Sequence, residues 1–262
     1  MDISGSRIII TGAANGIGAA MARRFARDGA RAIIVADLDA GGSEQIAAQV
    51  AASGIEAIAM PGDVSDERYI KALVDHAEQT WGGVDLFCSN AGIMAQGGPE
   101  EQDLVWNRAW NINVMAHVYA ARAALPGMLA RGSGYFLNSC SSAGLLTALG
   151  AAPYAASKHA AVAFSEWLAI TYANQGIGVS ALCPQAVRTK MVEDALEGEA
   201  GDAVRSAGRM IEPELVADQV SAALAAKQFL ILTHEETQDY VTKKVADPQK
   251  WIRNMSRFAA AP

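Results

Sequence analysis

The chain of 262 residues has little cysteine, little histidine and little charge. Its three cysteines, Cys88, Cys140 and Cys183, lie far apart beside apolar strand-like runs, a pattern that indicates buried reduced thiols rather than a disulfide framework. The four histidines are scattered without the spacing of metal ligands, so no metal site is expected. The net charge is −7 and no run of basic residues is present, which excludes a nucleic-acid-binding protein that relies on clustered Lys and Arg.

Long hydrophobic runs are also missing. No stretch offers 18 or more strongly apolar residues, so no membrane-spanning helix and no membrane partner are expected. The segment from Met1 to Ser6 has neither the cationic nor the apolar part of a secretory leader, and we expect a cytoplasmic protein. We find no linker and no internal repeat. Because 51% of the residues are hydrophobic, the chain can form one domain with a large core and further surface hidden in an oligomer interface.

Short apolar runs alternate with longer helical patterns along the chain. Nearly continuous apolar runs are typical of strands buried on both faces of a parallel sheet, and they occupy residues 7–11, 33–35, 84–88, 135–139, 177–183 and 229–232. Helical patterns begin at Ile17, follow Ser65 as an N-cap, occupy 111–131 and 154–174, and begin again at Pro213. The alternation predicts a single α/β domain: a doubly wound, Rossmann-type parallel sheet of about seven strands with helices on both faces.

Two segments fall outside this alternation. Residues 193–208 are rich in Ala, Gly and charge, with weak periodicity, and are expected to form a mobile lid over the substrate. Residues 234–262 form a charged helical tail that contains Tyr240, Trp251, Ile252 and Phe258. The tail either caps the substrate pocket or packs on a partner subunit.

A glycine-rich turn comes directly after the first strand, in the order Thr11-Gly12-Ala13-Ala14-Asn15-Gly16-Ile17-Gly18. Glycines let the backbone approach a pyrophosphate, which then sits at a helix N-terminus. Asp37 ends the second strand, where an acid would receive the 2′-hydroxyl of an adenosine ribose. Each feature alone is also compatible with an ordinary turn. Their order along one βαβ unit predicts a dinucleotide site.

Two further motifs follow the third and fourth strands. Asp63-Val64 follows the third strand and Asn90-Ala91-Gly92 follows the fourth. Together with the glycine-rich turn they resemble the single-domain branch of the short-chain dehydrogenase/reductase family, over Arg7 to about Met191. The resemblance implies that Asp63-Val64 meets the adenine and that the Asn-Ala-Gly turn lines the path of the cofactor. Ser89 stands where a second Asn is usual.

Four residues match the catalytic set of that family. Tyr154 and Lys158 are four residues apart on one helical face, and Ser141 precedes Tyr154 by thirteen residues, with Ser142 as its rival. Asn113, which on its own would be read as a helix-interior amide, is the fourth. The resemblance implies that Ser141 binds the substrate oxygen and that Asn113 holds a water in a proton relay. Tyr154 is then the general acid or base, and the Lys158 ammonium lowers its pKa and grips the nicotinamide ribose.

The expected cofactor is NAD rather than NADP. Asp37 would repel a 2′-phosphate, and neither Ala13, Ala14 nor Leu38 supplies a cation to hold one. The segment Pro184-Gln185-Ala186-Val187-Arg188-Thr189 resembles the family segment that seats the nicotinamide carboxamide, with Gln185 in place of the usual glycine. The predicted cofactor-binding residues are Gly12, Asn15, Gly16, Ile17, Gly18, Asp37, Leu38, Asp63, Val64, Asn90, Ala91, Gly92, Tyr154, Lys158, Pro184, Val187 and Thr189.

The substrate is expected to be a neutral, hydrophobic secondary alcohol or ketone, cyclic or aromatic. The loops beyond the carboxyl ends of the strands contribute apolar side chains and few charges; the candidate contacts are Met94, Gln96, Leu145, Leu149, Gln185 and Met191. A reductase of 3-oxoacyl groups on a carrier protein is an alternative. A non-catalytic nucleotide-binding regulator is another, although regulators usually lose part of the Ser-Tyr-Lys set. By resemblance, the helices at 111–131 and 154–174 pair two subunits into a homodimer or homotetramer.

Overall fold

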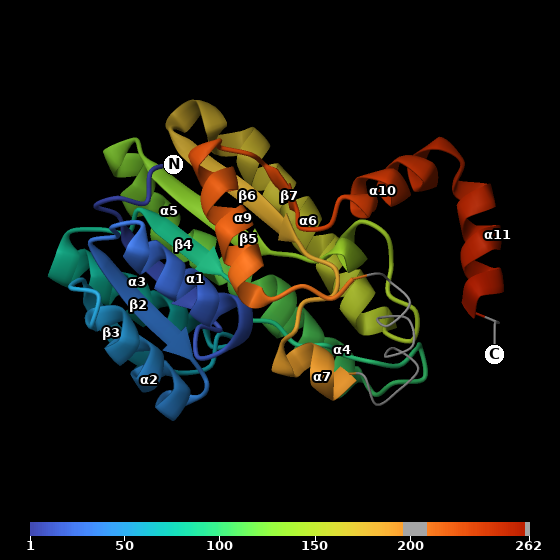
Figure 1. Ribbon diagram of the computed structural model, residues 1–262, viewed down its shortest axis with the longest axis horizontal. Coiled ribbons are helices and arrows are strands. Elements are labelled where there is room, and N and C mark those ends of the chain that lie inside the picture. The colour runs from blue at the N-terminus through green and yellow to red at the C-terminus, as the bar shows by residue number, and fades with distance from the viewer. Residues whose placement is uncertain (196–208, 260–262) are drawn as a thin grey trace.

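Seven strands form one sheet in the computed structural model, which describes residues 1–195 and 209–259 (Figure 1). The strands are β1 (Arg7–Thr11), β2 (Ala32–Asp37), β3 (Glu56–Pro61), β4 (Leu86–Ser89), β5 (Gly134–Ser139), β6 (Ile177–Cys183) and β7 (Leu230–Leu232). Their order across the sheet is β3-β2-β1-β4-β5-β6-β7, and every neighbouring pair is parallel. The predicted doubly wound, single-domain sheet is confirmed.

Helices cover both faces of this sheet because alternate strand residues point to opposite sides. Ile8 and Ile10 of β1 belong to one core with the helices α1 (Gly16–Arg27), α2 (Ala40–Ala51) and α9 (Pro213–Ala225). Ile9, between them, belongs to a second core with α3 (Glu67–Trp81), α5 (Ala116–Arg131) and α6 (Ala152–Tyr172). All three isoleucines are fully buried. A strand apolar on both sides is therefore what the layered fold requires.

The start of α3 differs from the sequence prediction. The expected N-cap was Ser65, but the cap is Asp66, whose carboxylate accepts a hydrogen bond from the Arg68 backbone N–H at 2.9 Å. The Ser65 hydroxyl donates instead to the carboxylate of Asp63 at 2.8 Å. The Ser65 hydroxyl and the Arg68 N–H thus each bond a carboxylate, which is a stronger acceptor than a hydroxyl. The helix therefore starts one residue later than predicted. Its end is as predicted, at Gly82 with a φ of 79°.

The helix expected over 111–131 is longer and less regular than predicted. It begins as α4 (Asp103–Trp110), passes through a π-helical turn, η1 (Asn111–Met115), and only then becomes the regular helix α5. Such turns are rare and are common at functional sites. Asn113 lies within this one, fully buried. The helix expected over 154–174 begins two residues earlier, as α6, and ends in a 3₁₀ turn, η3 (Ala173–Gln175).

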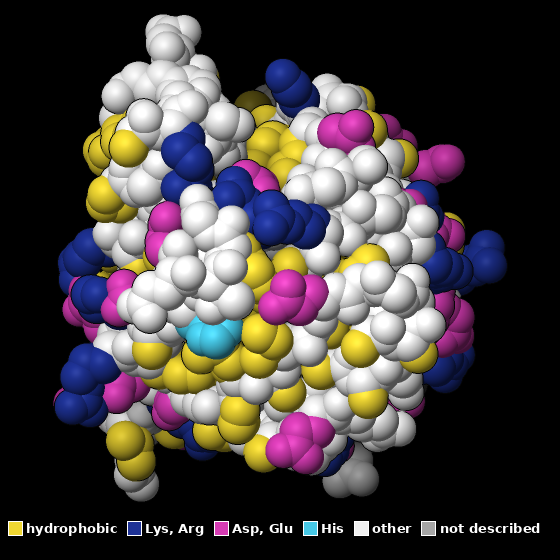
Figure 2. Space-filling model, turned by 90° about the vertical axis from the view of Figure 1, so that its left-hand side faces the viewer, with side chains coloured by type: hydrophobic (Ala, Val, Ile, Leu, Met, Phe, Trp, Pro, Cys, Tyr) yellow, Lys and Arg dark blue, Asp and Glu magenta, His cyan; other side chains and the backbone are white. Residues whose placement is uncertain are grey.

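The chain beyond β6 departs from the layered arrangement. The short helix α7 (Lys190–Ala195) follows β6 and contains the first three residues of the predicted lid, whose remainder, 196–208, lies outside the described residues. After β7, α10 (Glu236–Ala246) and α11 (Pro248–Ala259) extend away from the sheet (Figure 1). Within the described ranges, no helix is long and apolar enough to cross a membrane. On the face shown in Figure 2, basic and acidic side chains lie among one another, with apolar side chains between them.

Candidate active site

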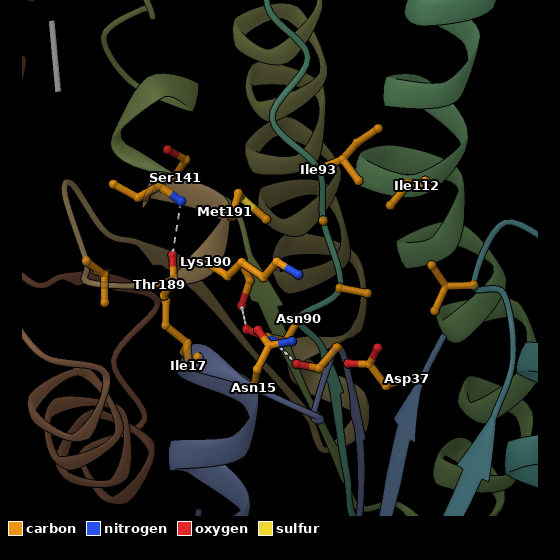
Figure 3. A pocket seen from close by; sticks show the side chains of 18 of the residues that line it. Asn15, Ile17, Asp37, Asn90, Ile93, Ile112, Ser141, Thr189, Lys190 and Met191 are labelled. Atoms are coloured by element: carbon orange, nitrogen blue, oxygen red, sulfur yellow. Dashed lines mark hydrogen bonds between the residues drawn. The ribbon is translucent and has the colours of Figure 1, made fainter. Parts of the chain in front are cut away.

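A cavity opens beyond the carboxyl ends of the strands, where ligands bind in doubly wound sheets. In the view of Figure 3, Ile17 and Thr189 lie on one side of it and Asp37 and Ile112 on the other, with Asn90 between them. Every predicted cofactor residue except Gly18 lines this cavity. Arg108, Ile93, Ile112, Lys190, Met191, Val192 and Asp194, which the sequence did not single out as cofactor contacts, line it too.

The glycine-rich turn packs tightly enough to explain its composition. A Cβ on Gly18 would lie 2.1 Å from the carbonyl oxygen of Gly12, and a Cβ on Gly12 would lie 2.8 Å from Cα of Ala91. Gly12 also has a φ of +63°, a conformation that side chains disfavour. Gly18 therefore holds α1 against the turn, while the N-terminus of α1, with its N-cap Asn15, faces the cavity. A backbone cradle of this kind fits the pyrophosphate of a dinucleotide.

Asn90 fastens the ends of three strands together. Its Nδ2 donates to the carbonyl oxygens of Thr11 (3.0 Å) and Gly12 (3.1 Å), and its Oδ1 accepts from the hydroxyl of Ser139 at 2.9 Å. The hydroxyl of Thr11 in turn accepts from the backbone N–H groups of Asn90 (3.0 Å) and Ala91 (3.1 Å). The Asn-Ala-Gly turn is thereby held beside the glycine-rich turn, so that both face the same cavity.

Asp37 and Ser141 lie on opposite sides of this cavity (Figure 3). One of its carboxylate oxygens accepts from the Ala14 backbone N–H at 2.9 Å and the other from the Asp39 backbone N–H at 3.0 Å. The neighbouring Leu38 is 71% exposed and also lines the cavity. A carboxylate fixed by two backbone donors keeps lone pairs free for the hydroxyls of a ribose.

Ser141, Tyr154 and Lys158 come together where β5 ends against α6. Ser141 and Tyr154 are each 8% exposed, and both line the cavity. The φ of Ser141 is +154°, a strained value for a residue with a side chain, and its hydroxyl accepts from the Ala143 backbone N–H at 3.1 Å at the start of the 3₁₀ turn η2 (Ser142–Gly144). Lys158 Nζ lies 5.7 Å from the centre of the Tyr154 ring and donates to the Ser139 carbonyl oxygen at 2.8 Å.

The protonation of this pair differs from the sequence prediction. We expected the ammonium of Lys158 to lower the pKa of Tyr154. In the structure, burial raises the pKa of the Tyr154 hydroxyl, and its interaction with Ser141 only partly opposes this rise. Burial also lowers the pKa of Lys158 to about 8. The ammonium lies over the ring and bonds to a carbonyl oxygen, so the desolvation of a phenolate is the larger effect.

The side chain of Asn113 positions its neighbours. Its Oδ1 accepts from the Ile93 N–H at 2.9 Å, and its Nδ2 donates to the Ile93 carbonyl oxygen and to the Ser157 hydroxyl, both at 3.0 Å. The Ser157 hydroxyl donates to the carbonyl oxygen of Tyr154 at 2.8 Å. Asn113 therefore ties the loop after β4 to Ser157 of α6, whose hydroxyl bonds the backbone of Tyr154. Both N–H groups of the Asn113 side chain are bonded to the protein. The water that the resemblance places in a proton relay at Asn113 stays a prediction.

A second cavity adjoins the first and shares Tyr154 and Ser141 with it. Of the predicted substrate contacts, Met94, Leu149, Gln185 and Met191 line this second cavity. Gln96 and Leu145 line neither cavity: Gln96 is exposed, and Leu145 packs against the core cluster around Cys140 and Ala161. Four side chains of the tail complete the lining, namely Tyr240, Trp251, Met255 and Phe258.

Gln185 lies at the border of the two cavities and lines both. Its Nε2 donates to the hydroxyl of Thr237, in the first turn of α10, at 2.5 Å. Its Oε1 is buried and has no hydrogen-bond partner among the described residues. The side chain that replaces the family's glycine therefore joins the end of β6 to the tail.

Sequence reasoning left open whether the tail caps the substrate pocket, and it missed Met255 and several supports of the site. Trp251, Met255 and Phe258 follow the i, i+4, i+7 spacing of one helical face, a signal that was present. Thr11 and Ser157 act through side chains that meet the site only after folding, and nothing in their local sequence indicates it. Ser89, the departure from the family pattern, is buried with no partner for its hydroxyl among the described residues.

Comparisons with known proteins agree with this geometry. Residues 6–200 match the short chain dehydrogenase family. The chain is similar to a 1-deoxy-11-beta-hydroxypentalenate dehydrogenase of Streptomyces exfoliatus (35% identity; 88% of this chain, 83% of the relative). It is also similar to a cyclohexanol dehydrogenase of Acinetobacter sp. (29% identity; 83% and 86%).

Solved structures show the same likeness. A short chain dehydrogenase/reductase of Burkholderia phymatum in complex with NAD has a TM-score of 0.86 at 30% identity, over 94% of this chain and 96% of that one. A putative gluconate 5-dehydrogenase of Beutenbergia cavernae with bound NADP has a TM-score of 0.81 at 29% identity, over 91% and 100%. With this coverage, and with the glycine-rich turn and the Ser-Tyr-Lys cluster placed around one cavity, the chain belongs to the short-chain dehydrogenase/reductase family.

Proposed function

We propose that the chain is an NAD-dependent oxidoreductase that interconverts a secondary alcohol and a ketone, with Tyr154 as general acid and base. The observation that carries the proposal is the position of Tyr154, which lines both the cavity with the dinucleotide features and the apolar cavity next to it. A substrate in the second cavity then has its reacting carbon at the border with the first. The three buried thiols fit the reducing cytoplasm that the sequence predicts.

The residues divide the chemistry as follows. A bound nicotinamide supplies the hydride chemistry. In the oxidation, Tyr154 as phenolate takes the proton of the substrate hydroxyl while a hydride leaves the same carbon, so that a ketone forms; in the reduction, Tyr154 returns the proton. Ser141 donates a hydrogen bond to the substrate oxygen. Below about pH 8 Lys158 is an ammonium; its charge offsets part of the cost of a buried phenolate on Tyr154, and it holds the ribose hydroxyls.

Asp37 supports NAD over NADP. Its carboxylate is held by the backbone N–H groups of Ala14 and Asp39, so it cannot easily turn away from a bound adenosine. A 2′-phosphate at that place would meet a fixed like charge, whereas two ribose hydroxyls would meet acceptors.

The lining of the second cavity supports a neutral, hydrophobic substrate. Among the described residues that line it, none is charged, and Met94, Leu149 and Met191 present apolar side chains. The volume of this cavity, about 380 Å³, suits a small molecule. One relative is named for cyclohexanol, a neutral cyclic secondary alcohol. We therefore favour a cyclic or aromatic alcohol over a charged hydroxy acid.

A substrate panel tests the proposal. Alicyclic and aromatic secondary alcohols, and small charged hydroxy acids, are each supplied with NAD or NADP, and NAD(P)H formation is followed at about 340 nm. We expect the hydrophobic alcohols with NAD to give the highest kcat/KM. A clear preference for a charged hydroxy acid would contradict the substrate class, and no turnover of any alcohol or ketone would contradict the reaction.

A further inference from the structure

We propose that α10 and α11 form the distal wall of the substrate cavity and that Trp251, Met255 and Phe258 select substrates with a bulky apolar part far from the reacting carbon. This inference rests on the proposed function, because it assigns the non-reacting part of the same substrate to the tail.

The lining of the cavity gives the first reason. Trp251, Met255 and Phe258 come from one face of α11 and line the same cavity as Tyr154 and Ser141. Tyr240 of α10 completes this wall, with its ring centre 6.4 Å from that of Trp251. Four large side chains of the tail thus share one cavity with the two residues that would hold the substrate oxygen.

Two attachments fix the tail to the loops of the site. Gln185 at the end of β6 donates to Thr237 at the start of α10. At the other end of α10, Nζ of Lys244 donates to the carbonyl oxygens of Leu145 (2.7 Å) and Leu146 (2.8 Å), in the loop that follows Ser141. Gln185 and Leu146 both line the substrate cavity, so the tail is attached to its wall at two points and its place there does not depend on apolar packing alone.

The exposure of α11 gives the third reason. None of its side chains is buried, and Phe258 is 46% exposed even though it faces the cavity. Its polar side carries Lys250, Arg253 and Arg257. An amphipathic helix needs a partner for its apolar face, and here that face borders a cavity with no charged side chain among its described lining residues. The apolar body of a substrate would cover it.

Substitutions on this one helix test the wall. Met255→Ala and Phe258→Ala each remove a lining side chain, and Ile252→Ala removes an apolar side chain of the same helix that is 59% exposed and lines neither cavity. We compare a bulky fused-ring alcohol, decahydro-2-naphthol, with the small alcohol 2-butanol. For each lining variant we expect kcat/KM for the bulky alcohol to fall about tenfold or more, and that for 2-butanol to change by less than about threefold. Ile252→Ala should leave both values near those of the wild type.

Binding keeps the test independent of turnover. Calorimetry of decahydro-2-naphthol in the presence of NADH should show weaker binding to Met255→Ala and Phe258→Ala than to the wild type and Ile252→Ala. If no alcohol is turned over but this difference in binding is found, the proposed reaction fails and the wall stands. If the lining variants bind the bulky alcohol as the wild type does, or lose the small and the bulky substrate equally, the wall is wrong. Circular dichroism of each variant confirms that the fold is kept.

Discussion

The Nζ atom of Lys158 donates a hydrogen bond of 2.8 Å to the carbonyl oxygen of Ser139. This contact joins the first half of α6 to the last residue of β5, and the buried ammonium both lines the cofactor cavity and lies over the ring of Tyr154. Because the same ammonium touches the strand end, the ring and the cavity, its removal should affect more than one step.

Tyr154→Phe should abolish turnover and leave NADH binding nearly intact. The change removes the only proposed proton carrier and keeps the ring, and general acid–base catalysis is worth about 10²–10⁴-fold in rate. Steady-state kinetics gives the activity, and NADH fluorescence titration gives the dissociation constant. A Tyr154→Phe enzyme that retains more than about a tenth of the wild-type activity would remove Tyr154 from the mechanism.

Lys158→Ala should weaken both turnover and NADH binding. The lysine is proposed to stabilise the phenolate and to hold the ribose, so the same two measurements separate it from Tyr154→Phe. A variant that binds NADH as well as the wild type would show that Lys158 has no part in cofactor binding.

The wild type should prefer NAD(H) over NADP(H) by at least about 100-fold in kcat/KM, because desolvated like charges commonly cost several kcal/mol. Asp37→Asn keeps the shape of the side chain and removes its charge. It should narrow the preference mainly by improving kcat/KM with NADP(H). Equal efficiencies of the wild type with both cofactors would contradict the role of Asp37.

Most of the fold could be predicted because its signals are local. Ile8, Ile9 and Ile10 are consecutive apolar residues, and only a strand covered on both faces buries all three. The spacing from Ser141 to Tyr154 to Lys158 likewise places the catalytic candidates without knowledge of the tertiary structure.

What could not be predicted depends on contacts between distant segments. The π-helical turn accompanies the bonds of Asn113 to Ile93 and Ser157, which lie twenty and forty-four residues away. Gln185 donates to Thr237, fifty-two residues later, so the sequence alone did not show where the Gln185 side chain points. The higher pKa of Tyr154 follows from burial, which only the folded chain reveals.

The stability of the protein should fall in acid because of His117. The imidazole lies on α5, 1% exposed; burial and then the nearby Lys158 ammonium lower its pKa to about 3. In the unfolded chain it takes up a proton near pH 6.5. Between about pH 6.5 and about pH 3 only the unfolded chain binds this proton. The free energy of unfolding is therefore unaffected by His117 above about pH 6.5 and falls as the pH drops from there towards about 3. At about pH 4.5 the loss should be roughly 3 kcal/mol.

Urea unfolding at about pH 7 and pH 4.5 measures this effect. His117→Leu cannot take up the proton, so its free energy of unfolding should fall less between the two pH values than that of the wild type. His76→Asn replaces a half-buried imidazole on α3 and is the matched control; it should follow the wild type. An equal loss in His117→Leu and the wild type would assign the acid sensitivity to other groups.

The chain should form a dimer or tetramer through α4, α5 and α6. Large apolar side chains are exposed on two of these helices, which contact each other: Leu104 is 73% and Trp110 46% exposed on α4, and Trp167 is 54% and Ile170 75% exposed on α6. Exposed apolar side chains of this size on neighbouring helices are candidates for an interaction site. Two copies related by a two-fold axis would bury the same patch on each subunit.

Light scattering at micromolar concentration measures the assembly. The wild type should have the mass of a dimer or tetramer, and the double variant Trp167→Glu/Ile170→Asp should shift towards the monomer, because each interface would then bury two pairs of like charges without partners. Ile252→Asp places the same kind of charge on the exposed side of α11 and should keep the wild-type mass. A wild type that runs as a clean monomer would contradict the expected assembly. A double variant that keeps its mass would place the interface elsewhere.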